Sequence, residues 1–220
     1  MPIREFSDNA VDPKVRGFLH LPDPPNDDGL VLSHGAGSNA SAPLLVALAD
    51  TFSANGFTVL RCDLPYRQSR SFGPPGPDDA ARDRAGLRNA LAAMRKMISG
   101  GLFLGGHSYG GRQSSMLCAE EPDLVTALLL FSYPLHPPRK PEQQRIQHLP
   151  DLRTPTLFVQ GTRDPFGSIA EMEQALKLIP GKTKLLPVEG VGHDLGFKGK
   201  AKREDLSGTA LKEFQEFSGS

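Results

Sequence analysis

Cysteine is scarce in this sequence, with only Cys62 and Cys118 among 220 residues. Two cysteines are too few for a disulfide framework, and both fall in segments where we expect them to be buried as small apolar side chains. An excess of charge of either sign is also lacking, since lysine plus arginine and aspartate plus glutamate both number 25. The chain therefore has no overall basic field that would favour nucleic acid or an anionic membrane.

Long apolar runs are missing as well. No stretch approaches the roughly 20 residues of a membrane-spanning helix, and the first residues, MPIREFSDNA, lack the apolar core of a secretory signal. The hydrophobic fraction of 38% and the mean hydropathy of -0.32 suit a soluble globular protein. We therefore expect a cytoplasmic protein without a nucleic-acid or membrane partner, folded as one domain over residues 1–220.

What the sequence does have is a regular alternation of short apolar runs and amphipathic stretches. This pattern is typical of an α/β fold, with a mostly parallel sheet and helices on both of its faces. The strands are predicted at Val15–Leu21, Leu30–Ser33, Phe57–Arg61, Leu102–Gly106, Val125–Phe131, Thr156–Gln160 and Thr183–Val188. The helices are predicted at Leu44–Asn55, Asp78–Ile98, Gly110–Glu120, from a capping box at Ser168–Glu171 to Leu178, and over Leu206–Phe217.

Two segments rich in proline interrupt the alternation. Pro65–Pro77 is predicted to be a loop. Tyr133–Pro155 leaves room for at most a short helix, around Glu142–His148. The sequence shows no internal repeat and no convincing linker, so one domain is expected.

The most informative stretch is Gly106-His107-Ser108-Tyr109-Gly110, which fits the pattern Gly-x-Ser-x-Gly and follows a predicted strand. A serine on a tight turn between a strand and a helix is exposed and positioned to attack a carbonyl carbon. The flanking glycines allow the strained turn and the close approach of neighbouring backbone. We therefore predict that Ser108 is the nucleophile of a serine hydrolase.

A serine nucleophile needs a general base, which is usually a histidine oriented by a carboxylate. In enzymes with this turn the order along the chain is serine, acid, histidine. Three histidines, His20, His34 and His107, precede Ser108 and therefore do not fit this order. His136 and His148 come too early as well, because no carboxylate at the end of a predicted strand lies between them and Ser108. Only His193 remains, on a glycine-rich segment after the last strand.

The acid is expected in a loop that leaves the end of a strand. Asp164 follows the strand Thr156–Gln160 and is our prediction, with Asp194 and Glu189 as weaker alternatives. Two backbone N–H groups should bind the negatively charged oxygen of the reaction intermediate. We predict those of Tyr109 and Ala36, with Gly35 as the alternative to Ala36.

Other residues near the predicted strand ends leave two interpretations open. Tyr66, Tyr133, Phe166 and Gly35 either line a substrate pocket or only pack against it. Arg67 belongs to a set of basic residues that either forms a rim favouring an acidic acyl substrate or is solvated surface. The other members of that set are Arg61, Arg70, Arg139, Lys140 and Arg145.

Cofactor sites are not predicted. The glycines around Ala36 are not followed by the Gly-Lys-Ser/Thr of a phosphate-binding loop, and they do not complete a dinucleotide-binding Gly-x-Gly-x-x-Gly. No other histidine or cysteine stands at metal-ligand spacing from His34. We therefore expect neither a cofactor nor a metal.

Taken together, these motifs resemble the α/β-hydrolase superfamily over nearly the whole chain, from Val15 to Phe217. The segments that carry the resemblance are His34–Ser38, Cys62–Arg67, Gly105–Arg112, Gln160–Gly167 and Gly192–Asp194. With Tyr133–Pro138, the chain is more narrowly similar to small bacterial members described as dienelactone-hydrolase-like. True dienelactone hydrolases have a cysteine nucleophile, whereas this position is Ser108, so the resemblance implies the fold and the triad more than a substrate.

Many α/β-hydrolases insert a helical cap in the interval that Tyr133–Pro155 occupies here. The short interval implies a minimal or absent cap and an open site, which favours small or soluble acyl esters over long-chain lipids. The sequence thus predicts a carboxylic-ester hydrolase that forms an acyl-enzyme intermediate on Ser108. A thioesterase, an amidase or an acyltransferase with the same triad, or a non-catalytic interaction module, remain alternatives. The sequence does not choose between a monomer and a homodimer.

Overall fold

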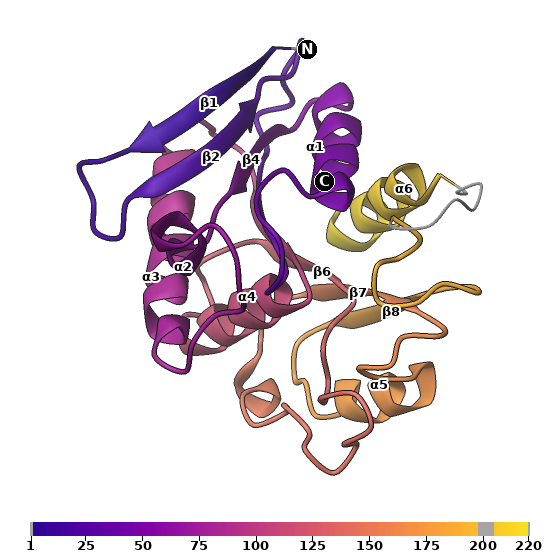
Figure 1. Cartoon of the computed structure of the whole chain (residues 1–220). Coiled ribbons are helices and arrows are strands. Elements are labelled where there is room, and N and C mark those ends of the chain that lie inside the picture. Colours follow the sequence, from indigo (N-terminus) through magenta and orange to yellow (C-terminus); the bar gives the residue numbers. More distant parts are fainter. Residues whose placement is uncertain (1, 198–204, 220) are drawn as a thin grey trace.

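A central sheet of eight strands runs through the protein (Figure 1). The computed structural model describes residues 2–197 and 205–219, so the ends of the expected domain 1–220 and residues 198–204 lie outside the described residues. The strand order is β1-β2-β4-β3-β5-β6-β7-β8. The strands are β1 Ile3–Asp8, β2 Val15–His20, β3 Gly29–Ser33, β4 Thr58–Cys62, β5 Leu102–His107, β6 Ala127–Phe131, β7 Thr156–Gly161 and β8 Thr183–Val188.

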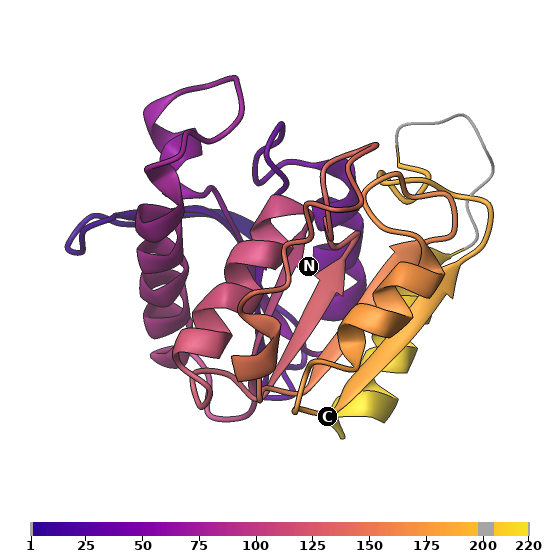
Figure 2. The same cartoon turned by 90° about the horizontal axis from the view of Figure 1, so that it is seen from below.

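The six strands from β3 to β8 are parallel to one another, and β1 and β2 are antiparallel additions beside β4. Parallel strands buried on both faces read as continuous apolar runs, and β3, β4, β6 and β7 are buried along their whole length. The carboxyl ends of all six strands therefore meet at one edge of the sheet, where the loops gather (Figure 2).

The strand β1 was not expected from the sequence. Its six residues, IREFSD, are mostly exposed and have no buried face that would give an apolar alternation. It exists because it pairs in register with β2, where Ile3 lies opposite His20 and Asp8 opposite Val15. Pairing between strands, which leaves no mark on the hydrophobic pattern, decided this element.

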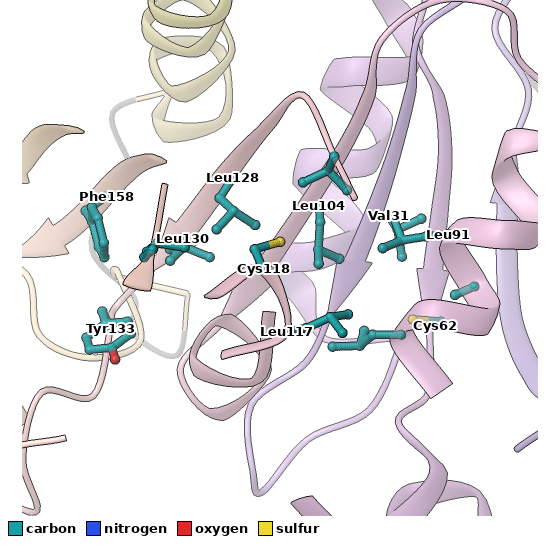
Figure 3. Close-up of a cluster of buried hydrophobic side chains, with 14 of the residues drawn as sticks. Val31, Cys62, Leu91, Leu104, Leu117, Cys118, Leu128, Leu130, Tyr133 and Phe158 are labelled. Atoms are coloured by element: carbon teal, nitrogen blue, oxygen red, sulfur yellow. The ribbon is translucent and has the colours of Figure 1, made fainter. Parts of the chain in front are cut away.

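Helices cover both faces of the sheet, as predicted. The helices are α1 Pro43–Ala54, α2 Pro65–Ser69, α3 Asp79–Arg95, α4 Tyr109–Glu120, α5 Ile169–Leu176 and α6 Leu206–Ser218. Buried residues of α1 and α6 form one apolar cluster on one face of the sheet. Those of α3, α4 and α5 form the other, part of which Figure 3 shows, including Cys62 and Cys118. No helix among the described residues is long and apolar enough to cross a membrane.

The two proline-rich segments differ from expectation in detail. Pro65–Pro77 begins with the short helix α2, because Pro65 occupies a first-turn position where its missing N–H costs nothing. In Tyr133–Pro155, which the structure describes throughout, a short helix was allowed at most around Glu142–His148, and the helical element is a single 3₁₀-turn, η1, at Leu149–Asp151. No cap covers the strand ends in this interval, and the predicted fold with a minimal or absent cap is confirmed.

Candidate active site

Ser108 lies on a sharp turn between β5 and α4. Its φ of 53° and ψ of -115° place it in a backbone region that residues other than glycine rarely occupy. Its N–H donates to the carbonyl oxygen of Phe131 at 2.8 Å, which ties the turn to the end of β6. A Cβ on Gly106 would lie 2.5 Å from the nitrogen of Gly111, and one on Gly110 would lie 2.6 Å from the carbonyl oxygen of His34. Only glycine fits at both places, so the motif is dictated by packing around the serine.

The Ser108 hydroxyl begins a chain of hydrogen bonds that ends at a buried carboxylate. Its Oγ lies 2.8 Å from Nε2 of His193, and Nδ1 of the same ring lies 2.8 Å and 3.0 Å from the two carboxylate oxygens of Asp164. An ionised carboxylate only accepts hydrogen bonds, so it places the ring proton on Nδ1 and leaves Nε2 to accept from the serine.

The two partners of Ser108 come from the loops after β7 and β8. Asp164 is 5% exposed, and its Oδ1 also accepts from the backbone N–H of Phe166 at 2.9 Å. The Phe166 ring lies against the imidazole of His193, with 4.1 Å between ring centroids. Nε2 of His107 is 2.9 Å from the carbonyl oxygen of His193, which fixes the loop from the other side. His193 is therefore held on both sides in the orientation that faces Ser108.

The alternative acids have other partners. Asp194 accepts the N–H of Gly196 at 3.1 Å, and Glu189 accepts the hydroxyl of Thr162 at 3.4 Å. Asp164 is the carboxylate that contacts the imidazole of His193 through both of its oxygens.

A cavity of about 580 Å³ opens above Ser108. Of the predicted site residues it contains Ser108, His193, Ala36, Tyr109, Gly35 and Phe166. The remaining lining is Gly37, Ser38, Ala42, Pro43, Leu44, Pro74, Pro75, His107, Arg112, Pro134, Arg145, Asp194 and Phe197. The loop that carries Ala36 and the turn that carries Tyr109 thus border the same space as the serine hydroxyl.

Both a family model and solved structures match this chain. The family model of the alpha/beta hydrolase domain matches residues 26–218. The chain belongs to the α/β-hydrolase family. Solved structures agree on the fold of this hydrolase, at 17 to 20% identity.

Three of these structures cover almost the whole chain. DcsB, solved with a substrate analogue, has a TM-score of 0.78 at 17% identity, with 99% of each chain covered. A serine hydrolase without lid from Xanthomonas campestris has a TM-score of 0.73 at 17% identity, covering 98% of this chain and 96% of its own. A dienelactone hydrolase from Anabaena variabilis has a TM-score of 0.72 at 20% identity, covering 99% and 97%.

Two of the predicted pocket residues of this hydrolase, Tyr66 and Arg67, do not line the cavity. Tyr66 is 1% exposed, and its hydroxyl donates to the carbonyl oxygens of Ala36 at 2.8 Å and Gly35 at 3.3 Å. The guanidinium of Arg67 donates to the carbonyl oxygens of Ser38 at 2.7 Å and Ala36 at 3.2 Å. The prediction is corrected: both side chains lie behind the loop and fix its carbonyls, because α2 points them inward.

Tyr133, a third pocket candidate, does not line the cavity either, and the interpretation in which it only packs holds. Its side chain is buried among apolar residues, against the ring of Phe158 at 5.7 Å between centroids (Figure 3). Its hydroxyl donates to the carbonyl oxygen of Arg145 at 3.1 Å. A position just past a strand end indicates nearness to the site but not the direction of the side chain, and here the side chain turns into the core.

Sequence reasoning missed Asp83, a fully buried carboxylate on α3. It accepts the hydroxyl of Tyr109 at 2.7 Å and the backbone N–H of Tyr66 at 3.0 Å, and thus links the serine turn to the start of α2. Burial raises the pKa of Asp83 and also that of the Tyr109 phenol. The signal was present, because Asp83 has the same helical phase as the buried Leu87 and Ala90.

His34, expected to support the loop that carries Ala36, is completely buried. Its Nε2 accepts the backbone N–H of Leu64 at 3.1 Å, and its Nδ1 lies 2.9 Å from the carbonyl oxygen of Gly35. Burial lowers its pKa, so the neutral ring is favoured. Among the described residues, no cluster of three or more histidine, cysteine, aspartate or glutamate side chains could hold a metal ion.

Proposed function

We propose that the protein is a serine hydrolase that cleaves small or soluble carboxylic esters through Ser108, His193 and Asp164. The observation that carries the proposal is the continuous hydrogen-bond chain from the serine hydroxyl to the buried carboxylate. A serine hydroxyl is a poor nucleophile until a base takes its proton, and this chain supplies that base with a fixed tautomer.

In the first half of the reaction, Oγ of Ser108 forms a bond to the ester carbonyl carbon while its proton moves to Nε2 of His193. The carbonyl oxygen becomes negatively charged and is stabilised by the N–H groups of Ala36 and Tyr109. Asp164 stabilises the imidazolium that forms. The bond to the alcohol oxygen then breaks, and the proton on His193 goes to the leaving alcohol.

In the second half, a water molecule replaces the alcohol. His193 takes one of its protons as the water oxygen attacks the acyl carbon, and the same two N–H groups stabilise the second negatively charged intermediate. The bond between the acyl carbon and Oγ breaks, and His193 returns the proton to Ser108. The free carboxylic acid leaves and the resting state is restored.

Two features of the structure support a small or soluble substrate. The interval Tyr133–Pro155 contains no cap, so the cavity opens to solvent beside the strand ends. A cavity of about 580 Å³ lies within the range of small-molecule sites. That the protein acts in the cytoplasm, as one domain, without a cofactor, a metal or a nucleic-acid or membrane partner, stays a prediction from the sequence.

The proposal is tested by covalent labelling. A fluorophosphonate probe should label the folded protein on Ser108, and Ser108→Ala should abolish labelling while the circular-dichroism spectrum is unchanged. Heat-denatured protein serves as the control for non-specific reaction. A folded wild-type protein that is not labelled would instead support a non-catalytic interaction module.

The reaction type is tested by a matched panel. Esters, acyl-CoA thioesters and anilides of the same short acyl group are compared by kcat/KM, each with and without an added alcohol acceptor. We expect the oxygen esters to be hydrolysed fastest and water to be the acceptor. A faster thioester, amide or transfer reaction would assign the same triad to a thioesterase, an amidase or an acyltransferase.

A further inference from the structure

Two guanidinium groups line the cavity that contains Ser108. Arg112 is in the first turn of α4, four residues after the serine, and Arg145 comes from the segment after β6. Both elements belong to the half of the molecule on the α4 side of the sheet. Leu44, which also lines the cavity, belongs to α1 and to the apolar cluster on the opposite face. One side of the cavity is therefore cationic and the other apolar.

Neither arginine has a carboxylate partner among the described residues. Other arginines do have such a partner: Arg16 pairs with Asp63, Arg84 with Glu120 and Arg88 with Glu121. The Nε of Arg112 is buried and, within the described part of the chain, has no hydrogen-bond partner. Buried N–H donors are almost always satisfied, so this unsatisfied donor shows that the described residues do not use the full hydrogen-bonding capacity of the Arg112 guanidinium.

The positive charge is held in place by contacts that do not neutralise it. Arg145 donates from Nη1 to the carbonyl oxygen of Pro134 at 3.2 Å, and its backbone N–H donates to Leu135 at 2.7 Å. Its own carbonyl oxygen accepts the hydroxyl of Tyr133. Burial and the nearby charge of Arg112 lower the pKa of Arg145, so the two cations lie close enough to repel each other. A bound anion would relieve that repulsion.

The carboxylate that lines the same cavity belongs to Asp194, on the segment after β8. It accepts the backbone N–H of Gly196 at 3.1 Å, a contact within its own loop. The acid of the triad, Asp164, is turned toward His193 and is not part of the cavity lining. The cationic side of the cavity thus keeps its charge for a group that enters from solvent.

We infer that Arg112 and Arg145 form a subsite for an anionic group, a carboxylate in the first instance, carried by the ester that Ser108 attacks. This inference rests on the proposed function and narrows its substrate class to monoesters that carry an acid. Guanidinium groups suit this task because they stay charged and their donor geometry matches a carboxylate. The anion on the substrate would also orient the ester carbonyl toward the serine, which raises kcat/KM by positioning.

The test compares an acid with its neutral counterpart. The substrates are 4-nitrophenyl hydrogen glutarate and 4-nitrophenyl methyl glutarate, which differ only at the far end of the acyl group, a carboxylate in the first and a neutral methyl ester in the second. We expect the wild-type ratio of kcat/KM, acid over methyl ester, to exceed ten. Arg112→Gln and Arg145→Gln should each lower that ratio at least tenfold, mainly through KM. Arg139→Gln removes an exposed guanidinium from the same segment and should keep the wild-type ratio.

A second pair of substrates asks which half of the ester carries the acid. In 4-acetoxybenzoic acid the carboxylate is on the alcohol side, and its methyl ester is the neutral counterpart. A preference for the acid in this pair alone, lost in both arginine variants, would place the anion on the leaving group. Because Arg112 is partly buried, the unfolding temperature of each variant is measured, and Arg145→Gln carries the test if Arg112→Gln does not fold.

The outcomes separate this inference from the proposed function. If the wild-type protein hydrolyses acid and methyl esters with equal kcat/KM in both pairs, the subsite is refuted and the hydrolase stands. If Ser108 is not labelled and neither ester is hydrolysed, the proposed function fails. In that case calorimetric titration with glutarate tests the subsite without any catalysis. Binding to the wild-type protein that is lost in Arg112→Gln and Arg145→Gln supports the subsite, and absence of binding refutes it.

Discussion

The molecule contains two serine–histidine pairs with the same separation. Ser108 Oγ lies 2.8 Å from Nε2 of His193, and Ser115 Oγ lies 2.8 Å from Nε2 of His148. The two serines stand seven residues apart, one at the turn that begins α4 and the other inside that helix. Only the first borders the cavity. A close serine–histidine contact is therefore not enough to define a nucleophile.

The difference between the pairs lies in the direction of the hydrogen bond. The Ser115 hydroxyl donates to the carbonyl oxygen of Arg112, so it can only accept from the ring of His148. At the other pair, Asp164 holds the ring proton on Nδ1 and Nε2 of His193 is free to accept from Ser108. The first arrangement closes a helix turn, whereas the second lets His193 accept a hydrogen bond from a hydroxyl that borders the cavity.

The largest effect is expected from substitution of the proposed nucleophile. Ser108→Ala should lower kcat for a 4-nitrophenyl ester by about 10⁴-fold or more, because the covalent intermediate cannot form. Ser115→Ala is the matched control and should keep kcat within about threefold, since its hydroxyl is fully buried and does not reach the cavity. Turnover of both variants under saturating ester measures the contrast. Equal losses would mean that the two pairs are not functionally distinct.

The carboxylate is tested next. Asp164→Asn should lower kcat by about 10³- to 10⁴-fold with the fold intact, because the amide no longer imposes the tautomer in which Nε2 of His193 accepts. Asp151→Asn changes an exposed carboxylate near His148 and should leave kcat within about twofold. The measurement is kcat together with the circular-dichroism spectrum. Near-normal turnover in Asp164→Asn would show that another acid orients the histidine.

A smaller effect is expected from the turn that separates the two serines. In Gly110→Ala the new Cβ would meet the carbonyl oxygen of His34 and the hydroxyl of Ser33, both at 2.6 Å. We expect a loss of about 1–3 kcal/mol in the free energy of unfolding, because this backbone cannot move far. Gly37→Ala, where a Cβ meets nothing within 4 Å, should change stability by less than about 0.5 kcal/mol. Urea unfolding of both variants measures the difference, and equal midpoints would contradict the packing argument.

The last prediction concerns the pH dependence of stability at the second pair. Burial, with help from Arg112 and Arg84, lowers the pKa of His148 to about 4. Below pH 6.5 the imidazole of His148 binds a proton more readily in the unfolded chain than in the folded one. The contribution of His148 to the free energy of unfolding is therefore complete above pH 6.5 and is lost as the pH falls toward 4. The slope is at most about 1.4 kcal/mol per pH unit for one group.

His148→Gln should therefore flatten the decline of the unfolding free energy between pH 6.5 and 4. His20, whose pKa burial lowers to about 4, and His34, whose pKa burial also lowers, should leave a residual slope in the variant. Urea midpoints at pH 7, 6 and 5 provide the measurement. A decline as steep as in the wild-type protein would show that His148 does not contribute to the pH dependence of stability.

Much of the fold could be predicted from the hydrophobic pattern. Strands β3 to β7 are buried along nearly their whole length, so their apolar runs stand out between turn residues, and the capping box at Ser168 sets the start of α5 as expected. The exposed β1 gave no such signal, and the proline-rich pattern that allowed a short helix around Glu142–His148 did not locate η1 at Leu149–Asp151. The predictable elements are those that bury an apolar face by themselves.

For the candidate site, chain order selected Ser108, His193 and Asp164, and the structure brings these side chains into contact. Chain order was less informative about the direction in which a side chain points. Tyr66 and Tyr133 stand at strand ends as expected but turn into the core, whereas Arg112, which was not singled out, lines the cavity. Position along a strand is a local property of the chain, but the face to which a side chain turns depends on what packs around it.

The sequence by itself determined the α/β alternation, the turn at Ser108 and the order of the residues that follow it. These depend on local backbone demands, on burial and on chain order, all of which are written into neighbouring residues. Only the tertiary structure decided that Ser108 donates to a histidine while Ser115 accepts from one, and that two arginines without a carboxylate partner among the described residues share the cavity. Hydrogen-bond direction and charge pairing depend on groups distant in the chain, which only folding brings together.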